Sequence, residues 1–257
     1  MVKPFYVNIG KEEEVFLTVA TQKLPLLLKG PTGTGKSRFI EYMAWKLNRK
    51  LITVLCNDET SSIDLVGRFL IKGSETIWQD GPLTTAVKEG SIIYIDEIAE
   101  ARPDILVAIH SLTDYRRTLF IERKNEEIKA ADDFLLIASF NPGYQRGFKE
   151  MKPSTRQRFV CLDFQYPKAD VEIEIISGET KIDSNIAKKL VSFANLVRSK
   201  PEIGLIETIS TRLLVAACLL IKNGLPPRLS ARTAIILPLS DDNDTVSALQ
   251  DMFNLIL

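Results

Sequence analysis

The sequence predicts an α/β fold in which helices cover both faces of a mostly parallel sheet, followed by a smaller all-helical domain. Five short apolar runs, rich in β-branched residues and separated by helical or polar stretches, have the pattern of strands that are buried on both faces. These runs are residues 24–28, 51–55, 91–95, 134–138 and 159–164. After Pro167 the strand pattern stops and helical periodicity begins, so we predict two domains, 1–166 and 167–257.

Helical segments are predicted on both sides of this boundary. Residues 37–48 place apolar side chains on one helical stripe and supply the first crossover between parallel strands. In the second domain, apolar residues recur at helical spacing from Ile186 to Val197. Candidate helix caps stand at Asp183 or Ser184, at Ser210, and at Asp242 or Asn243.

The composition favours a cytoplasmic protein and disfavours several classes of function. The 33 Lys and Arg residues balance 33 Asp and Glu residues, whereas nucleic acids and anionic membranes are bound by an excess of positive charge. No signal peptide is visible, and the longest apolar run, 213–221, is shorter than the roughly 20 residues that span a bilayer. One His and three widely spaced Cys residues do not predict a metal site. We therefore expect no nucleic-acid partner and no membrane partner.

Two polar segments interrupt the alternation of predicted strands and helices. Apolar segments on either side of Lys72-Gly73-Ser74-Glu75 predict one hairpin, and those flanking Arg123-Lys124-Asn125-Glu126 predict a second. From this pattern alone, both are equally compatible with plain surface hairpins and with functional insertions.

A phosphate-binding loop is predicted between the first strand and the first crossover helix. Residues 30–37 fit the pattern G-x-x-x-x-G-K-[ST], and a strand before it and a helix after it are the context that this motif requires. In such a loop backbone N–H groups surround the phosphates, the Lys neutralises the β- and γ-phosphate oxygens, and the last hydroxyl binds Mg²⁺. The candidate ATP-binding residues are Gly30, Pro31, Thr32, Gly33, Thr34, Gly35, Lys36 and Ser37.

Two acidic residues at the end of a buried strand supply the second part of the predicted site. Asp96 follows the apolar run 91–95 and would complete the Mg²⁺ site with Ser37, while the adjacent Glu97 would polarise the attacking water. Acidic residues in this position also serve as helix caps. The phosphate loop earlier in the chain favours the catalytic interpretation.

Three further side chains are candidates for the same reaction. Asn141, after the run 134–138, would bond the γ-phosphate or the water, and its alternative role is to form a turn before Pro142. Arg158 precedes the fifth strand, and Arg212 begins a helix of the second domain. Arginines in such places are often only solvated. In the functional interpretation one reaches the γ-phosphate from a neighbouring subunit and the other from the helical domain.

Several stretches carry a resemblance to a known family. They are residues 29–37, 64–68, 78–84, 96–97, 141–145 and 152–159. Together they resemble the AAA+ ATPases of the MoxR group, in particular its CbbQ/NorQ branch, whose NorQ members are also called NirQ. The resemblance covers nearly the whole chain, and Thr34 and Asn57 depart from the residues that relatives commonly have.

The resemblance implies a five-stranded sheet of order 5-1-4-3-2, a small helical lid, and a homo-hexameric ring that hydrolyses ATP with Mg²⁺ at its subunit junctions. Lys36 and Ser37 then belong to the Walker A motif, and Asp96 and Glu97 belong to the Walker B motif. The two hairpins correspond to a helix-2 insert and a pre-sensor-1 hairpin that face the ring pore. They occupy about residues 65–82 and 116–131.

The remaining candidates also acquire roles through the resemblance. Asn141 is implied as sensor 1 and Arg212 as sensor 2. Arg158 is implied as the arginine finger, with Arg156 as a second candidate for the same role.

The family also implies a partner protein with a von Willebrand A domain and a client enzyme. CbbQ-type relatives reactivate inhibited Rubisco together with CbbO, and some are associated with carboxysomes. NorQ-type relatives mature nitric oxide reductase together with NorD. We expect a Rubisco-reactivating motor, with nitric oxide reductase maturation as the alternative, and we expect specificity to lie in the hairpins, the pore or the adaptor.

Three other classes of protein fit the sequence less well. A P-loop metabolite kinase needs an acceptor pocket and normally lacks the combination of Glu97 and Asn141. A DNA-remodelling ATPase is disfavoured by the balanced charge. A nucleotide-gated scaffold would bind ATP with negligible turnover.

Overall fold

The computed structural model describes residues 2–142 and 151–256, whose contacts form two compact units. The unit that we call the sheet unit contains Gly10–Gly30 and Lys36–Asp163, together with the first residues up to Pro4. The unit that we call the helical unit contains Phe5–Ile9, Pro31–Gly35 and the chain from Phe164 onward. Each unit has its own hydrophobic core. The assignment of residues 1–166 as an ATPase domain and 167–257 as a lid stays a prediction.

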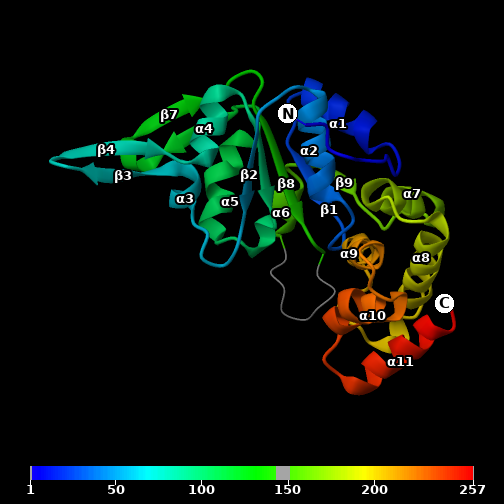
Figure 1. Ribbon diagram of the computed structural model, residues 1–257. Coiled ribbons are helices and arrows are strands. Elements are labelled where there is room, and N and C mark those ends of the chain that lie inside the picture. The colour runs from blue at the N-terminus through cyan, green and yellow to red at the C-terminus, as the bar shows by residue number, and fades with distance from the viewer. Residues whose placement is uncertain (1, 143–150, 257) are drawn as a thin grey trace. The chain divides into compact units, whose positions relative to one another are not determined.

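A five-stranded parallel sheet forms the centre of the sheet unit (Figure 1). Its strands are β1 Leu26–Lys29, β2 Leu51–Leu55, β5 Ile92–Asp96, β8 Leu135–Phe140 and β9 Val160–Asp163. Their order, β9-β1-β8-β5-β2, is the predicted 5-1-4-3-2 once these five strands are numbered along the chain, so the predicted fold is confirmed. Because all neighbouring strands are parallel, their carboxyl ends lie at one edge of the sheet.

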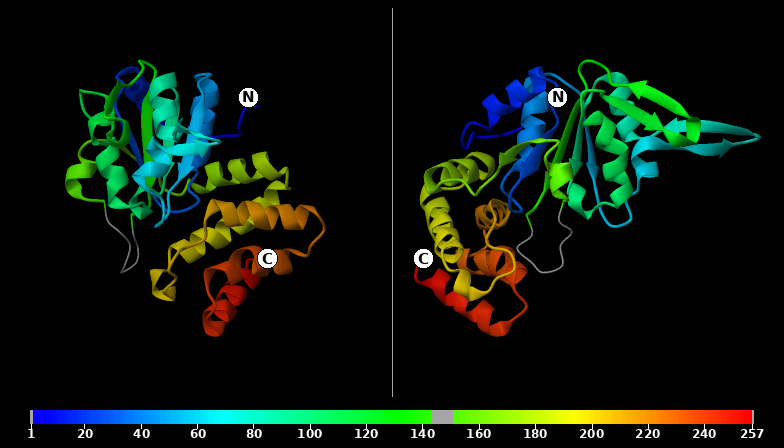
Figure 2. Two further views of the ribbon diagram at one scale, coloured as in Figure 1. Left: turned by 90° about the vertical axis from the view of Figure 1, so that its left-hand side faces the viewer. Right: turned by 180° about the vertical axis from the view of Figure 1, so that it is seen from behind.

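Helices cover both faces of this sheet, as the front and back views show (Figures 1 and 2). One face carries α1 Glu12–Thr21 and α2 Lys36–Lys46, whose Phe16 and Phe39 rings pack edge to face at 5.6 Å between centroids. The other face carries α3 Ser62–Val66, α4 Pro82–Glu89 and α5 Pro103–Ile109. Short 3-10 turns at Ile98–Glu100 and His110–Leu112 flank α5, and the one-turn helix α6, Pro153–Arg156, precedes β9.

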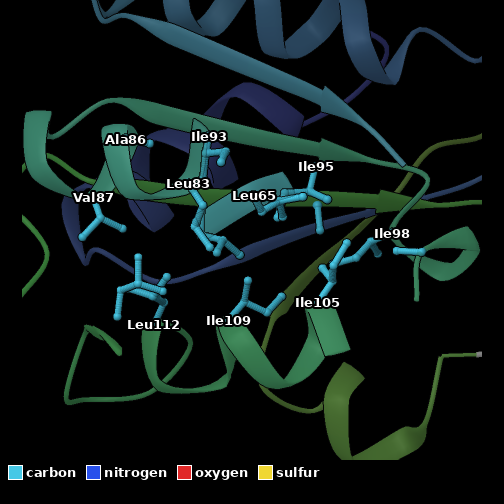
Figure 3. Packing of buried hydrophobic residues seen from close by; sticks show 14 of the residues in the cluster. Leu65, Leu83, Ala86, Val87, Ile93, Ile95, Ile98, Ile105, Ile109 and Leu112 are labelled. Carbon is cyan, nitrogen blue, oxygen red and sulfur yellow. The ribbon is translucent and has the colours of Figure 1, made fainter. Parts of the chain in front are cut away.

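The alternation of β5 decides which of its side chains enter this core. Ile93 and Ile95 point toward apolar residues of α4 and α5, among them Leu83 and Ile109 (Figure 3). Successive side chains of a strand point to opposite faces. Tyr94 and Asp96 therefore point to the face of the sheet that α2 covers.

Both predicted hairpins are present and lie beside each other. The first pairs β3 Gly67–Lys72 with β4 Glu75–Asp80, and the second pairs β6 Thr118–Ile121 with β7 Glu126–Lys129. Lys124, in the 3-10 turn Glu122–Lys124 of the second hairpin, lies 5.8 Å from the centroid of the Trp78 ring on the first. Exposed apolar side chains occur on both hairpins, at Phe69, Ile71, Ile77 and Phe120.

The helical unit is built from antiparallel and crossing helices around one apolar cluster (Figure 2). They are α7 Ala169–Thr180, α8 Ser184–Arg198, α9 Thr211–Lys222, α10 Pro227–Ala231 and α11 Asn243–Asn254, with a 3-10 turn at Pro201–Ile203, a π-helical turn at Arg232–Ile236 and another 3-10 turn at Leu237–Leu239. The described part of the chain contains no helix with the length and apolar character needed to cross a membrane.

Two of the predicted helix caps of this unit make capping hydrogen bonds, and a third does not. Asp183 and Asp242 each accept a hydrogen bond from a backbone N–H of the first turn, at Asn185 and Thr245, as helix-capping carboxylates do. Ser210 occupies the N-cap position of α9, but its side chain makes no capping hydrogen bond.

A buried ion pair joins three segments of the helical unit. Glu172 of α7 is fully buried and accepts two hydrogen bonds from the Arg198 guanidinium, at 2.7 and 2.9 Å. It accepts a third from the Thr211 hydroxyl at 2.6 Å. Arg198 also donates to the Ile209 carbonyl at 2.8 Å, and its guanidinium lies 4.1 Å from the Tyr166 ring centroid. Every polar atom of the pair is thus used, which is the condition under which a buried ion pair is tolerated.

Replacing Glu172 with Ala should lower the free energy of unfolding of the helical unit by about 3–5 kcal/mol, because the largely buried Arg198 charge is left without its partner. The measurement is urea denaturation followed by circular dichroism. Glu174→Ala, at an exposed position of the same helix, is the matched control and should change stability by less than about 0.5 kcal/mol. Equal effects of the two substitutions would contradict the structural role of the pair.

Candidate functional site

The phosphate-loop motif connects β1 to α2, as predicted. Gly33 and Gly35 have backbone φ angles of +73° and +92°, in the left-handed region that favours Gly, so the motif needs Gly at these two positions. Lys36 begins α2, is nearly buried, and donates from Nζ to the carbonyl oxygen of Gly30 at 2.7 Å. The lysine side chain thus folds back along the loop toward the residue at which the motif begins.

Polar side chains from three elements meet at the carboxyl edge of the sheet. Lys36 Nζ also donates to Asn141 Oδ1 at 2.8 Å, just beyond β8. Ser37 Oγ donates to Asp96 Oδ2, at the end of β5, at 3.1 Å. The four predicted residues Lys36, Ser37, Asp96 and Asn141 therefore come together although they are distant in the sequence, because the strands that end here are parallel neighbours.

Glu97 adopts a backbone conformation that is uncommon for its residue type. Its φ angle is +55°, in the left-handed region, and its N–H donates to Ser139 Oγ at 3.1 Å. The Ser139 hydroxyl in turn donates to Asp96 Oδ1. Outside Gly, such a conformation is costly and persists where surrounding contacts enforce it. Ser139 therefore ties the carboxylate of Asp96 and the backbone of Glu97 to the same strand end.

Sequence reasoning missed two hydroxyl residues of this cluster, Ser139 and Tyr94. Both stand in strands that otherwise consist of apolar residues up to the strand end, and both are buried. Burial is the main reason that the pKa of Tyr94 is raised, followed by the nearby charge of Asp96. Burial, followed by the charges of Asp96 and Glu97, also raises the pKa of the Cys56 thiol to about 11. Both groups therefore remain protonated near neutral pH.

The middle of the phosphate loop has its contacts within the helical unit. The Thr34 hydroxyl donates to the Pro31 carbonyl at 2.9 Å, and the Thr32 hydroxyl donates to Glu207 Oε1 at 3.1 Å. A Cβ at Gly33 would lie 2.6 Å from Ser210 Cβ. The absence of a side chain at Gly33 is what permits this approach.

Arg212 lies close to this part of the loop. A Cβ at Gly33 would stand 3.6 Å from Arg212 Cβ. Tyr166, which packs under Arg198, donates from its hydroxyl to the Thr32 carbonyl at 3.2 Å. The start of α9, where Arg212 stands, is therefore tied to the loop through neighbouring residues of the helical unit.

The two candidate finger residues lie outside the hydrogen-bonded cluster. Arg156 is exposed on α6. Arg158 is also exposed, and its guanidinium lies 3.9 Å from the Asp114 carboxylate. Burial, followed by the charge of Arg158, lowers the pKa of the His110 imidazole. Arg158 thus has a defined carboxylate neighbour, whereas no ion pair of Arg156 is recorded in the described chain.

The oxygen atoms of Ser37 and Asp96 fit a Mg²⁺ ion. A hydroxyl and a carboxylate are the hard oxygen ligands that Mg²⁺ prefers, and Mg²⁺ is usually held by one or two protein groups together with substrate phosphates. Ser37 Oγ and Asp96 Oδ2 already lie 3.1 Å apart at the start of α2. The donor set is therefore suitable for a metal that also binds a nucleotide.

Comparisons with known proteins agree with this architecture. Residues 25–159 match the family model of the AAA domain of the dynein-related subfamily, which is more than half of the chain. Residues 172–256 match the model of the CbbQ/NirQ/NorQ C-terminal region. The chain belongs to the CbbQ/NirQ/NorQ family of AAA+ ATPases. The predicted family and the predicted ATPase class are thereby confirmed.

Two curated members of this family are similar to the chain over nearly its whole length. Protein CbbQ of Hydrogenophilus thermoluteolus is 50% identical, with 96% of this chain and 93% of the relative covered. Protein NorQ of Paracoccus denitrificans is 49% identical, with 97% and 92% covered. The two similarities are equal for practical purposes, so they support the family and not one of its branches.

A solved structure supports the fold. A RuvB mutant of Thermotoga maritima superposes with a TM-score of 0.57 at 15% sequence identity, with 96% of this chain and 71% of that chain covered. At this level of identity the similarity concerns the fold alone. Of the residues that carried the resemblance in the sequence, Gly143, Tyr144 and Gln145 lie outside the described residues.

Proposed function

We propose that this CbbQ/NirQ/NorQ-family ATPase is a Mg²⁺-dependent motor that uses ATP hydrolysis to remodel a client enzyme. The observation that carries the proposal is the meeting of Lys36, Ser37, Asp96 and Asn141 at the end of the phosphate loop. These groups would serve a triphosphate bound along residues 30–37. Bound Mg²⁺ would draw together the phosphate oxygens and neutralise the charge that develops as the γ-phosphate leaves.

Each residue of the cluster has a defined task in this proposal. Lys36 would exchange its bonds to Gly30 and Asn141 for phosphate oxygens, and Asn141 would then be released to bind the γ-phosphate or the water. Ser37 and Asp96 would hold Mg²⁺. Glu97, held by Ser139 at the strand end, would accept a proton from the attacking water.

We assign the remaining roles to three arginines. Arg212, beside Gly33, would act as sensor 2 on the bound nucleotide. In a homo-hexamer, Arg158 would reach the nucleotide of the neighbouring subunit as the arginine finger, and Arg156 is the second candidate. The Asp114 carboxylate, which accepts hydrogen bonds from Arg116, lies 3.9 Å from the Arg158 guanidinium and would attract it until a phosphate replaces this contact.

The two hairpins supply a surface for a client or an adaptor. Their exposed residues Phe69, Ile71, Ile77 and Phe120 are apolar side chains on two-stranded ribbons, and Lys124 links the second ribbon to Trp78 on the first. Phe69 and Ile71 lie on one face of the first ribbon and Ile77 lies on the other. Exposed apolar groups of this kind mark contact sites when they gather with others on a surface. We assign them to contact with the client or with an adaptor that carries a von Willebrand A domain.

For the client we propose inhibited Rubisco, acting with a CbbO-type adaptor. The similarity to protein CbbQ supports this choice. The alternative is maturation of nitric oxide reductase with a NorD-type adaptor, which the similarity to protein NorQ supports. Both alternatives use the same ATPase site.

Lys36→Ala should abolish ATP binding, whereas Glu97→Gln should retain binding and lose turnover. At about 100 times its dissociation constant, ATP should stabilise the wild type by roughly 2.7 kcal/mol and raise the melting temperature by several degrees. The measurements are thermal unfolding with and without ATP and the release of phosphate. Lys50→Ala, at an exposed lysine paired with Glu89, is the control. An undiminished thermal shift in Lys36→Ala would contradict the assigned site.

Arg158→Ala should reduce turnover by about 10³-fold or more, as the loss of an arginine finger does, and leave ATP binding intact. Arg156→Ala is the matched control. Because the finger acts on a neighbouring subunit, mixing Arg158→Ala with Lys36→Ala should restore part of the activity. Mixed hexamers without recovered activity would contradict action between subunits, and a larger loss in Arg156→Ala would transfer the role to Arg156.

With Rubisco inhibited by a tight-binding sugar phosphate, addition of this protein, a CbbO-type partner and ATP should restore carboxylation. Recovery should require both proteins and should fail with Glu97→Gln. Ile71→Ser should keep basal ATP turnover and lose recovery, whereas Val107→Ser, at an exposed apolar residue of α5, should keep both. If no cognate Rubisco recovers and co-expression instead activates nitric oxide reductase, the alternative client is correct.

A further inference from the structure

A phenol lies among the groups that we assign to Mg²⁺. Tyr94 of β5 is 1% exposed, and its hydroxyl donates to Asp96 Oδ1 at 2.7 Å. The same hydroxyl lies 3.3 Å from Ser37 Oγ. Tyr94 and Asp96 are two residues apart on one strand, so their side chains project from the same face of the sheet.

The two oxygens of the Asp96 carboxylate have different neighbours. Oδ1 accepts hydrogen bonds from Tyr94 and from Ser139 of β8. Oδ2 accepts the bond from Ser37 at 3.1 Å. A carboxylate oxygen has about two acceptor positions. Oδ1 is therefore used by the protein, while Oδ2 faces the start of α2.

Both donors are held rigidly. The Tyr94 ring is fully buried on one face of the central sheet, where β2 and β8 flank its strand β5. Ser139 is fully buried, and its hydroxyl oxygen is already engaged by the N–H of Glu97. Neither hydroxyl has space to turn toward solvent.

We propose that Tyr94 and Ser139 are positioning residues for Mg²⁺, which fix the Asp96 carboxylate so that Oδ2 is presented to the metal beside Ser37. This inference rests on the proposed Mg²⁺–ATP site. Groups that orient a metal ligand commonly change metal affinity by about 10- to 100-fold when they are removed. The two hydroxyls should therefore control how tightly Mg²⁺ is held, and should have little effect on metal-free nucleotide binding.

Tyr94→Phe removes one hydroxyl and keeps the ring in the sheet. At a fixed concentration of ADP, the Mg²⁺ concentration that gives half of the metal-dependent rise in melting temperature should increase about 10-fold. The affinity for ADP in EDTA, measured by calorimetry, should equal that of the wild type. Tyr115→Phe, at a tyrosine that is 93% exposed in the same unit, is the matched control and should leave the Mg²⁺ titration unchanged.

Ser139→Ala provides a second, independent variant. It removes the other donor to Oδ1 and should also raise the half-saturating Mg²⁺ concentration about 10-fold. The N–H of Glu97 also loses its acceptor in this variant. At saturating Mg²⁺, Ser139→Ala should therefore still hydrolyse ATP more slowly than the wild type, whereas Tyr94→Phe should reach the wild-type rate.

Three outcomes decide the inference. If the Mg²⁺ titration of Tyr94→Phe equals that of Tyr115→Phe, the inference is overturned. It is also overturned if Tyr94→Phe loses ADP affinity equally with and without Mg²⁺, because that result would show a purely structural role of Tyr94. If Tyr94→Phe does not fold, an unchanged titration in Ser139→Ala overturns it. A wild type whose ADP binding shows no response to Mg²⁺ would instead overturn the proposed metal site itself.

Discussion

The parallel register of β1, β5 and β8 brings the ends of three segments, distant in the chain, to one edge of the sheet. Ile95 pairs with Ala138 and Leu28 pairs with Ser139, so the residues that follow these positions meet where the backbone ladder ends. Buried polar groups at such an edge need hydrogen-bond partners, and here the protein supplies many of them. Lys36 therefore bonds to Gly30 and Asn141, and Asp96 bonds to Ser37, Tyr94 and Ser139. The candidate site is the cluster of hydrogen bonds that this register makes possible.

The same edge explains why a strained residue is found at Glu97. Asp96 completes β5 with its side chain toward α2, and a regular continuation would turn the next side chain to the opposite face. The left-handed conformation of Glu97, at φ +55°, ends the strand abruptly and is held by the bond to Ser139. The break in the strand thus separates the Asp96 carboxylate, which is committed to hydroxyl donors, from the residue that follows it. The neighbouring strand β8 maintains this conformation of Glu97, because Ser139 is buried there and fixed by packing.

The sequence predicted those features that depend on local pattern, namely the five central strands, the phosphate loop, both hairpins and the caps at Asp183 and Asp242. It missed features that depend on partners distant in the chain. Helix α7 was not predicted, because the charge of Glu172 interrupts its buried face, and only Arg198 and Thr211 make that charge tolerable. In the sequence, Tyr94 and Ser139 are single polar residues within apolar strands, and nothing in the local pattern indicates a role for them. Only the strand register shows that both lie beside Asp96. The roles assigned to the site residues stay predictions.

The division between a constrained site and unconstrained hairpins explains why overall similarity leaves the client open. Lys36, Ser37, Asp96 and Asn141 bond to one another at the strand ends, so these contacts constrain their identities in addition to the ATP chemistry that we propose for them. The exposed side chains of the hairpins, such as Ile71 at 84% exposure, have no such constraint from the interior. The sequence identity, which is near 50% to both CbbQ and NorQ, is calculated over the positions of the site and the exposed positions of the hairpins together. Under the proposed function, a change of client would therefore alter exposed residues of the hairpins, while the hydroxyl and carboxylate network around Asp96 could remain the same.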